Sequence, residues 1–405
     1  MSDFTVTVEK LLYGGDALAR RGDGKAVFIP FAVPGDRLRV RPAVEKKNYI
    51  HAEILEIITP GEGRVTPVCQ HFGKCGGCDW QQLEYFRQVE AKRRILEELF
   101  HHRFPETRRL TITMQPCPQP FGYRSRARVR RGADRAAGRK TEGLASPLVG
   151  FFRGGSHIIE DMESCPLFRP SLNEALLSLR RVPPDEYSGN VLEIDIASSE
   201  EEGKWATSND DGKETLLQRK VGEFIYNVAA GTFFQANDFI IDALLEYVMG
   251  CTSQNCGQNF GAALDLFSGV GLFSLPLAQR YSAVTSVEYS REARELCVMN
   301  AAEAGIENLE NVCADTAEWL SSQTGRFDCV VLDPPRAGVG FGVMERIERL
   351  VDGSLVYVSC DPQTLVRDME RLNMDRLRIV SIAGFDMFPQ THHFETVIHL
   401  ETASS

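Results

Sequence analysis

Apolar residues recur at every second position in short runs near the start of the chain, and glycine and proline separate these runs. The runs 5–12, 26–31, 38–44 and 51–58 predict strands, because such alternation is typical of a half-buried strand. Short strands at this spacing indicate a small barrel of the oligonucleotide-binding kind. We expect it to occupy residues 1–60, since Pro60 and Gly61 close the pattern.

The pattern changes after this unit. Residues 84–102 have the period of an amphipathic helix, and residues 110–225 are rich in strand-like runs. From about Asn227 onward, apolar strands alternate with helical segments, which predicts a parallel sheet with helices on both faces. We therefore expect an α/β protein with three domains, at 1–60, 61–225 and 226–405. The strands of the last domain are predicted at 263–267, 283–288, 329–333, 355–359 and 396–400.

The composition is that of a globular protein, with 43% hydrophobic and 25% charged residues in a chain of 405. No apolar stretch approaches the roughly 20 residues that span a bilayer, and the N-terminus does not resemble a secretory signal. We expect a cytoplasmic monomer with no membrane partner. Its 11 cysteines favour thiolate chemistry or metal ligation over a disulfide framework.

The net charge of −11 is unevenly distributed. Residues 84–140 contain 15 Lys and Arg against 6 Asp and Glu, whereas residues 185–223 contain 4 against 11. A basic segment within an acidic protein suits the phosphates of a nucleic acid, although a solvated surface has the same composition. Arginines alternate from Arg124 to Arg130, so one strand face could meet phosphates. The acidic segment 198–214 has no explanation in the sequence.

A strand leads through two glycines into a helix at Asp265-Leu-Phe-Ser-Gly-Val-Gly271. Such glycines let a ligand approach the backbone where the helix begins, and Glu288 ends the next strand, where a carboxylate meets ribose hydroxyls. A dinucleotide site has a third glycine where Ser274 stands. The motif therefore favours S-adenosylmethionine, while a capping or exposed role is the alternative for Asp265 and Glu288.

Two further strands end in residues that carry chemistry. Asp333-Pro-Pro-Arg336 follows one strand, and Cys360 follows the next, so both should lie at the carboxyl edge of the sheet. We expect a helix beginning near Gln363 to lower the pKa of the Cys360 thiol. A buried, unreactive cysteine is the alternative.

Glu395 ends a long polar turn before the last strand and is a candidate general base, with His392 and His393 as rivals. Cys360 and Glu395 together suit methylation of uracil C5, a weak carbon nucleophile. A thiolate that adds to C6 makes C5 electron-rich, and a base must then remove the C5 proton. Cys360 and Glu395 provide these two groups, and Asp333 can bind the cofactor or the pyrimidine.

Cys69, Cys75 and Cys78 lie within ten residues in a glycine-rich loop. Converging thiolates indicate an iron–sulfur cluster or zinc, either of which takes four ligands. Cys165, in Ser-Cys-Pro, is the better candidate for the fourth, and Cys117 is the rival. The spacing alone does not separate iron–sulfur from zinc.

Taken together, these motifs resemble the bacterial RNA uracil-C5 methyltransferases, in particular the iron–sulfur type with an N-terminal TRAM domain. The resemblance runs nearly end to end. It rests on Cys75-Gly-Gly-Cys78, on Phe234-Gln-Ala-Asn237, on the Asp265 and Asp333 motifs, and on Ser359-Cys-Asp-Pro362 and Phe394-Glu-Thr-Val397.

The resemblance implies a TRAM/OB-like barrel, a central β-rich iron–sulfur domain and a class I, Rossmann-like methyltransferase domain. It implies a [4Fe–4S] cluster on Cys69, Cys75, Cys78 and Cys165, and a nucleophile and base at Cys360 and Glu395. It also implies S-adenosylmethionine contacts from Gln235, Phe267, Glu288 and Asp333. Asp361 stands where the family usually has asparagine, and an unpaired carboxylate there would raise the thiol pKa.

The substrate that these features imply is RNA. The barrel and cluster resemble the 23S rRNA branch, with tRNA as the alternative, and Phe233 is a candidate platform for an extruded base. Two other functions fit the fold. A non-catalytic RNA-binding factor would have no need of Cys360 and Glu395. An amino-group methyltransferase would need no thiolate, and it usually has an aromatic residue where Arg336 follows the prolines.

Overall fold

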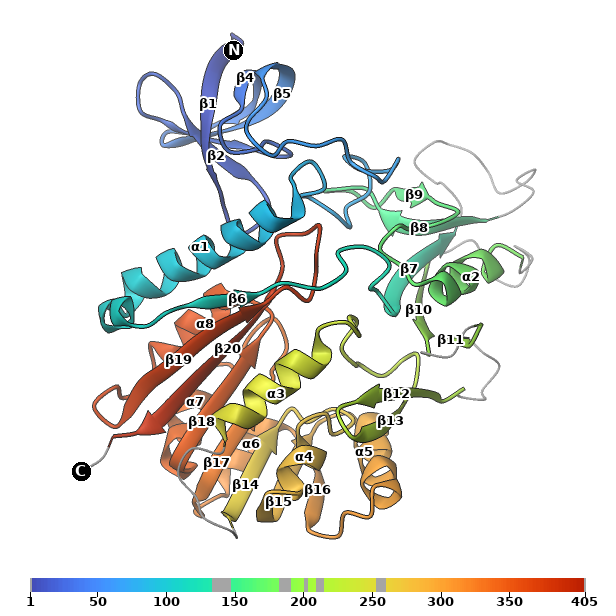
Figure 1. Cartoon of the computed structure of the whole chain (residues 1–405), viewed down its shortest axis with the longest axis vertical. Helices are drawn as coiled ribbons and strands as arrows, with labels where there is room; N and C mark the ends of the chain where they lie inside the picture. The colour runs from blue at the N-terminus through green and yellow to red at the C-terminus, as the bar shows by residue number, and fades with distance from the viewer. Residues whose placement is uncertain are drawn as a thin grey trace.

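The computed structural model describes residues 2–132, 147–181, 191–199, 203–208, 215–252 and 260–403 (Figure 1). The chain begins with a closed barrel whose strand order is β1-β2-β3-β5-β4. Alternate apolar side chains fill it, among them Val8, Ile29 and Leu38. The predicted strands are present, and the sequence missed β2 because its buried residues are the small Ala17 and Ala19. The strands are β1 (Phe4–Leu11), β2 (Ala17–Arg20), β3 (Ala26–Ile29), β4 (Arg37–Glu45) and β5 (Tyr49–Thr59).

Helix α1 (Tyr85–Arg103) follows, where helical spacing predicted it, and runs between the barrel and the C-terminal sheet (Figure 1). One face of α1 buries Leu96 and Phe100 and, one and two turns earlier, the polar Lys92 and Gln88. After η1 (Pro105–Arg109), a short strand β6 (Thr113–Gln115) joins the edge of the C-terminal sheet, which the sequence did not predict.

The middle of the chain forms a five-stranded sheet with the order β11-β10-β7-β8-β9, packed with helix α2 (Pro170–Ser178). The strand-rich character of this region was predicted and α2 was not. The acidic segment 198–214 lies largely outside the described residues. The strands are β7 (Arg126–Gly132), β8 (Leu148–Phe152), β9 (Ile159–Asp161), β10 (Leu192–Ser198) and β11 (Trp205–Thr207), with a separate hairpin of β12 (Leu217–Val221) and β13 (Phe224–Val228).

An eight-stranded sheet, ordered β16-β15-β14-β17-β18-β20-β19-β6, forms the C-terminal half. Its strands are β14 (Phe260–Leu266), β15 (Tyr281–Glu288), β16 (Leu309–Cys313), β17 (Phe327–Leu332), β18 (Val351–Ser359), β19 (Leu377–Phe385) and β20 (Glu395–Thr402) together with β6. Its helices are α3 (Ile241–Cys251), α4 (Ser274–Ala278), α5 (Arg291–Glu303), α6 (Thr316–Ser321), α7 (Val343–Leu350) and α8 (Pro362–Met369).

The predicted strands β14, β15, β17 and β18 are parallel, as expected, and the unpredicted β16 is parallel to β15. β20 instead runs antiparallel to β18 and to β19, a strand that was not predicted. β20 is antiparallel to β19 because the connection 386–394 between them is short, and a parallel crossover needs a dozen residues or more. The strands from β14 to β18 end at one edge, where the motifs of the sequence lie. None of the described helices is long and apolar enough to cross a membrane.

Candidate active site

Cys360 and Glu395 lie side by side at the same edge of the sheet. Ser359, the last residue of β18, pairs directly with Thr396 of β20 in an antiparallel register. Cys360 follows Ser359 and Glu395 precedes Thr396, so the two side chains occupy neighbouring positions. The sequence predicted that the two would act together, and the β18–β20 pairing is what brings them together.

Glu395 is buried, and its Oε2 atom has no hydrogen-bond partner among the described residues. Burial raises the pKa of this carboxyl well above its usual range, and Asp333 raises the pKa further. A buried acceptor without a partner is costly unless a ligand completes it. Glu395 is therefore a buried carboxyl group whose free oxygen a ligand could partner.

The pKa of the Cys360 thiol is raised to about 12, so the expectation of a lowered pKa is wrong. Burial is the largest cause, followed by the carboxylates Glu395 and Asp333, while Arg336 acts in the opposite direction. The helix was correctly predicted, since α8 begins at Pro362. The dipole of its N-terminus is outweighed by desolvation and by acidic neighbours.

Asp361 is the N-cap of α8. Its Oδ1 atom accepts hydrogen bonds from the backbone N–H groups of Gln363 at 3.0 Å and Thr364 at 3.1 Å. Asp361 also contributes to the raised pKa of Cys360, although the prediction expected this only of an unpaired carboxylate and Asp361 is hydrogen-bonded. The carboxylate thus stabilises the helix and disfavours the thiolate next to it.

The two histidines of the preceding turn are occupied elsewhere. The His392 ring is hydrogen-bonded to Asp79, whose Oδ2 atom also accepts the His392 backbone N–H at 3.0 Å. Burial and the neighbouring His392 and Arg336 lower the pKa of His393 to about 2, and Arg336 is hydrogen-bonded to its ring at 2.7 Å. His393 is therefore a weak base, which leaves Glu395 as the stronger candidate.

A pocket has Asp333 on its wall, and the same carboxyl raises the pKa of both Cys360 and Glu395. Gln235 Nε2 donates to Asp333 Oδ2 at 3.4 Å, and burial raises the pKa of Asp333 to about 7. The pocket also contains Phe267, whose backbone has a φ of 61°, and Ser268, whose buried hydroxyl has no partner in the described structure. The remaining lining residues are Phe233, Phe234, Gly269, Val270, Leu272 and Phe273.

Glu288 lies behind the glycine turn of this pocket. Its Oε2 atom accepts the Gly269 N–H at 2.9 Å, and Oε1 accepts the Ser290 N–H at 2.7 Å. The carboxylate therefore fixes the turn that lines the pocket. Asp265, at the start of the same motif, is fully buried and bonded to Ser274, and burial raises its pKa to about 7.

Comparisons with known proteins identify the family. The family model tRNA (uracil-5-)-methyltransferase matches residues 184–403. A 23S rRNA (uracil(1939)-C(5))-methyltransferase of Shewanella amazonensis is 31% identical and covers 96% of this chain and 93% of its own length. The chain belongs to the tRNA (uracil-5-)-methyltransferase family. It is an RNA uracil-C5 methyltransferase.

The fold of this methyltransferase is also shared. A tRNA (uracil-54, C5)-methyltransferase of Pyrococcus abyssi superposes with a TM-score of 0.73, at 24% identity, over 98% of this chain and 99% of that one. An uncharacterised RNA methyltransferase of Thermosynechococcus vestitus is 29% identical over 98% of this chain and 97% of its own. The class I methyltransferase fold is therefore shared with a protein of known structure over nearly the whole chain.

The four predicted ligand cysteines of the methyltransferase line one cavity. Cys69, Cys75 and Cys78 come from the loop after the barrel, and Cys165 comes from the segment before α2. Cys117 lies elsewhere, with its sulfur against the Asn237 amide. Within the described ranges, no group of three or more His, Cys, Asp and Glu side chains is arranged to hold a metal ion.

The arginines that alternate along β7 share one face, as predicted, but carboxylates of β10 already partner two of them. Arg128 is paired with Asp195 at 2.9 Å, and Arg130 with Glu193 at 2.7 Å. Arg126 is half-buried and donates to the Ala230 carbonyl at 3.0 Å. This face is therefore partly structural, and Arg128 is its exposed arginine.

The sequence did not predict that two residues, Tyr13 and Arg336, lie at the candidate site. Tyr13, from the β1–β2 turn of the barrel, reaches the Cys360 carbonyl, and Arg336 lowers the pKa of both Cys360 and Glu395. Arg336 belongs to the Asp333 motif, so its place in that motif could have indicated that it lies at the site. Nothing in the sequence around Tyr13 indicates an active site, because only the packing of the barrel brings it there.

Proposed function

We propose that this enzyme methylates a uridine of 23S rRNA at C5, using S-adenosylmethionine, with Cys360 as the nucleophile and Glu395 as the base. The observation that carries this proposal is the β18–β20 register, which sets a thiol beside an unpartnered buried carboxylate. One protein group must add to C6 and another must remove the proton from C5, and these are adjacent atoms of one pyrimidine ring. The two protein groups must therefore lie close together.

The pocket with Asp333 on its wall fits the cofactor. The Phe267 backbone, the free Ser268 hydroxyl and the Gly269 turn provide a close backbone approach and an unsatisfied polar group. Gln235, Phe267, Glu288 and Asp333 would hold S-adenosylmethionine there, with Glu288 also bracing the turn. The bound cofactor supplies an electrophilic methyl group. The relative from Pyrococcus abyssi was solved with S-adenosyl-L-homocysteine.

The residues of the chain then divide the reaction between them. The Cys360 thiol gives its proton to solvent and its sulfur forms a bond to C6 of the uracil. The C5–C6 π bond breaks in this step, and its electron pair leaves C5 electron-rich. After C5 is methylated, the Glu395 carboxylate removes the C5 proton. The C–H electron pair forms the C5–C6 double bond and the C6–S bond breaks, so that Cys360 is released. Arg336 favours both ionised forms, because it lowers the pKa of Cys360 and of Glu395.

The four cysteines around one cavity support a metal-binding role, and the resemblance of the Cys75-Gly-Gly-Cys78 motif to the iron–sulfur family favours a cluster over zinc. A polynuclear cluster binds each thiolate through a different metal atom, so its ligands surround a cavity. Aromatic and aliphatic side chains line this cavity, and the Gly77 N–H donates to Cys75 Sγ at 3.4 Å. We propose [4Fe–4S] on Cys69, Cys75, Cys78 and Cys165, with a structural role.

The choice of 23S rRNA rests on the relatives. The proteins named 23S rRNA (uracil(1939)-C(5))-methyltransferase are 30–31% identical and cover 96–98% of the chain. The Pyrococcus abyssi tRNA enzyme covers the whole architecture too, so the presence of a barrel does not separate the two substrates. A uridine in tRNA is accordingly the second candidate.

Two experiments test this proposal. Mass-spectrometric mapping of 5-methyluridine in cells with and without the protein should show one lost site in 23S rRNA, and a loss confined to tRNA would move the substrate to tRNA. With RNA that carries 5-fluorouridine, the unmutated enzyme should form an adduct stable to denaturing electrophoresis, since fluorine cannot leave as a cation. Cys360→Ala should form none, and Glu395→Gln should accumulate a methylated adduct on ordinary RNA.

A further inference from the structure

The connection 386–394, which ends at the proposed base, is held at four successive backbone carbonyls. Met387 O accepts from Asn237 Nδ2 at 3.0 Å, and Phe388 O accepts from Lys92 Nζ at 3.2 Å. Pro389 O accepts from the Tyr123 hydroxyl at 3.1 Å, and Gln390 O accepts from the Trp80 N–H at 3.1 Å. This connection is therefore fixed by elements that come from outside the C-terminal sheet.

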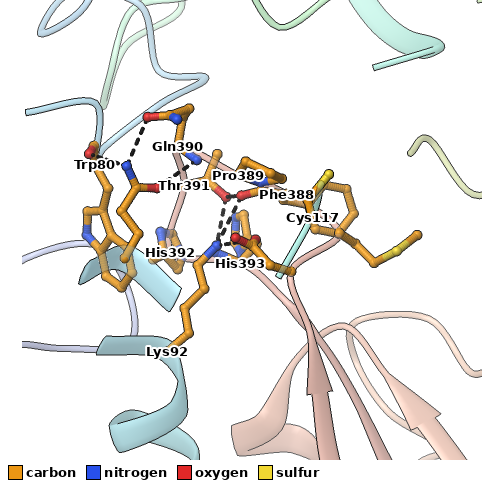
Figure 2. A network of polar contacts seen from close by, with 12 residues as sticks. Trp80, Lys92, Cys117, Phe388, Pro389, Gln390, Thr391, His392 and His393 are labelled. Carbon is orange, nitrogen blue, oxygen red and sulfur yellow. Dashed lines mark hydrogen bonds and ion pairs between the residues drawn. The ribbon is translucent and has the colours of Figure 1, made fainter. Parts of the chain in front are cut away.

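Helix α1 adds two buried side-chain contacts to this connection (Figure 2). The side chains of Lys92 and Asp386 are both fully buried, with Nζ and Oδ1 2.6 Å apart. One turn earlier on α1, Gln88 Nε2 donates to Gln390 Oε1 at 3.0 Å, and Gln88 Oε1 accepts the Gln390 N–H at 2.9 Å. Gln390 has a φ of 72°, which a glutamine adopts only when its surroundings impose it.

A buried lysine–aspartate pair is weak evidence for stability. Well-packed apolar residues in its place are often neutral or stabilising, because the two charges must be desolvated. A buried pair instead fixes one arrangement over others, which is its best-attested use. The question is therefore which arrangement the Lys92–Asp386 pair fixes.

The register of β19 and β20 gives the answer. Phe385, the last residue of β19, pairs with Glu395, the first residue of β20. Asp386 directly follows Phe385, so the ion pair lies next to the ladder position of Glu395. A shift of Asp386 would alter the end of this ladder, and with it the position of Glu395 relative to Cys360.

We infer that Lys92 is a positioning residue for the proton-removal step of this reaction, acting through Asp386 on Glu395. The inference rests on the proposed function, because it assumes that Glu395 is the base. Lys92 contributes no atom to the reacting groups, and α1 acts as a brace for the catalytic connection. The cofactor pocket lies on other elements and should not depend on Lys92.

The test compares the last step of the reaction in three variants. Lys92→Met removes the buried cation, Lys92→Met/Asp386→Leu replaces the pair by apolar groups, and Glu370→Gln breaks the exposed α1 ion pair Arg103–Glu370 as a matched control. For each, the affinity for S-adenosyl-L-homocysteine, the melting temperature and the fraction of enzyme held in a methylated RNA adduct are measured during turnover.

Lys92→Met should bind the homocysteine ligand normally, release product about tenfold more slowly or worse, and accumulate the adduct, because a misplaced base loses much of its catalytic effect. The double variant should retain the unmutated melting temperature and still accumulate the adduct, while Glu370→Gln turns over normally. A variant that is merely less stable would lose adduct formation and turnover in equal proportion, and this outcome contradicts the inference.

Turnover of the double variant at the unmutated rate would also contradict the inference. Failure of the proposed function is distinct from both results. It would appear as the absence of any adduct between the unmutated enzyme and 5-fluorouridine RNA, whatever the behaviour of the Lys92 variants.

Discussion

The Tyr13 hydroxyl, in the N-terminal barrel, donates a hydrogen bond to the Cys360 carbonyl at 3.4 Å. Its ring meets those of His392 and Phe394 edge to face, with centroids 5.4 and 6.0 Å away. Burial and Asp361 raise the pKa of Tyr13, so the hydroxyl keeps its proton and remains a donor. The barrel thus contacts both the segment of Cys360, the proposed nucleophile, and the connection that leads to Glu395, the proposed base.

We predict that Tyr13→Phe slows adduct formation with 5-fluorouridine RNA by about fivefold, the effect of losing a hydrogen bond worth about 1 kcal/mol. The phenylalanine ring keeps the edge contacts, so Tyr13→Ala should be slower still. Rapid-quench measurement of the adduct checks this. Tyr49→Phe, a tyrosine elsewhere on the barrel, is the control, and equal rates for Tyr13→Phe and the unmutated enzyme would refute the prediction.

The raised pKa of Cys360 predicts an alkaline profile for its reaction with iodoacetamide in the free enzyme. Since only the thiolate reacts, modification should still accelerate above pH 9.5, in keeping with a pKa of about 12. Glu395→Gln removes a negative neighbour and should move the profile to lower pH. Peptide mass spectrometry reports each site, with the exposed Cys313 as an internal reference. A plateau of Cys360 modification below pH 9 would contradict the prediction.

Asp265 should make the enzyme less stable as the pH rises. Its pKa is about 7 in the folded protein and near 3.9 in an unfolded chain, so the folded state holds its proton more tightly. Its contribution to stability is full below about pH 4 and is lost as the pH rises to 7. Asp265→Asn should flatten this decline by a few kcal/mol. Urea unfolding of both proteins at pH 5 and pH 8 measures the change in the free energy of unfolding between the two pH values. The same change in Asp265→Asn and in the unmutated enzyme would refute the prediction.

The cysteine cavity yields a prediction about composition. Anaerobically purified enzyme should contain about four irons and four sulfides per chain. Cys165→Ser should lose them, because Cys165 lines the cavity with Cys69, Cys75 and Cys78, whereas Cys117→Ser should retain them. Metal and labile sulfide analysis decides this, and stoichiometric zinc without sulfide would overturn the cluster assignment.

Residues that carry chemistry within a continuous motif were predictable from the sequence. Cys360, Glu395 and Asp333 each follow or begin a strand with a clear apolar pattern, and the sheet brings such ends together. The barrel was predictable for the same reason, since alternation over short runs leaves few other folds. The local sequence pattern was sufficient to predict the position of a functional residue wherever that residue is adjacent to its strand in the chain.

Contacts between distant segments were not predictable. Lys92 looked like one cation of a basic, amphipathic helix, and only the packing of α1 against the connection 386–394 buries it beside Asp386. The pKa of Cys360 was predicted in the wrong direction because the helix dipole is visible in the sequence, while the burial and the facing carboxylates are not. β6 was missed because three residues carry too little pattern.

The position of β6 has a consequence for how the protein can be divided. Thr113, Met114 and Gln115 pair with Ala383, Gly384 and Phe385 of β19, so a segment from the first third of the chain completes the last sheet. A fragment that begins at residue 226 would leave β19 with a row of open N–H and C=O groups, which invite pairing with another chain. Such a fragment should aggregate through this edge, although it contains every methyltransferase motif.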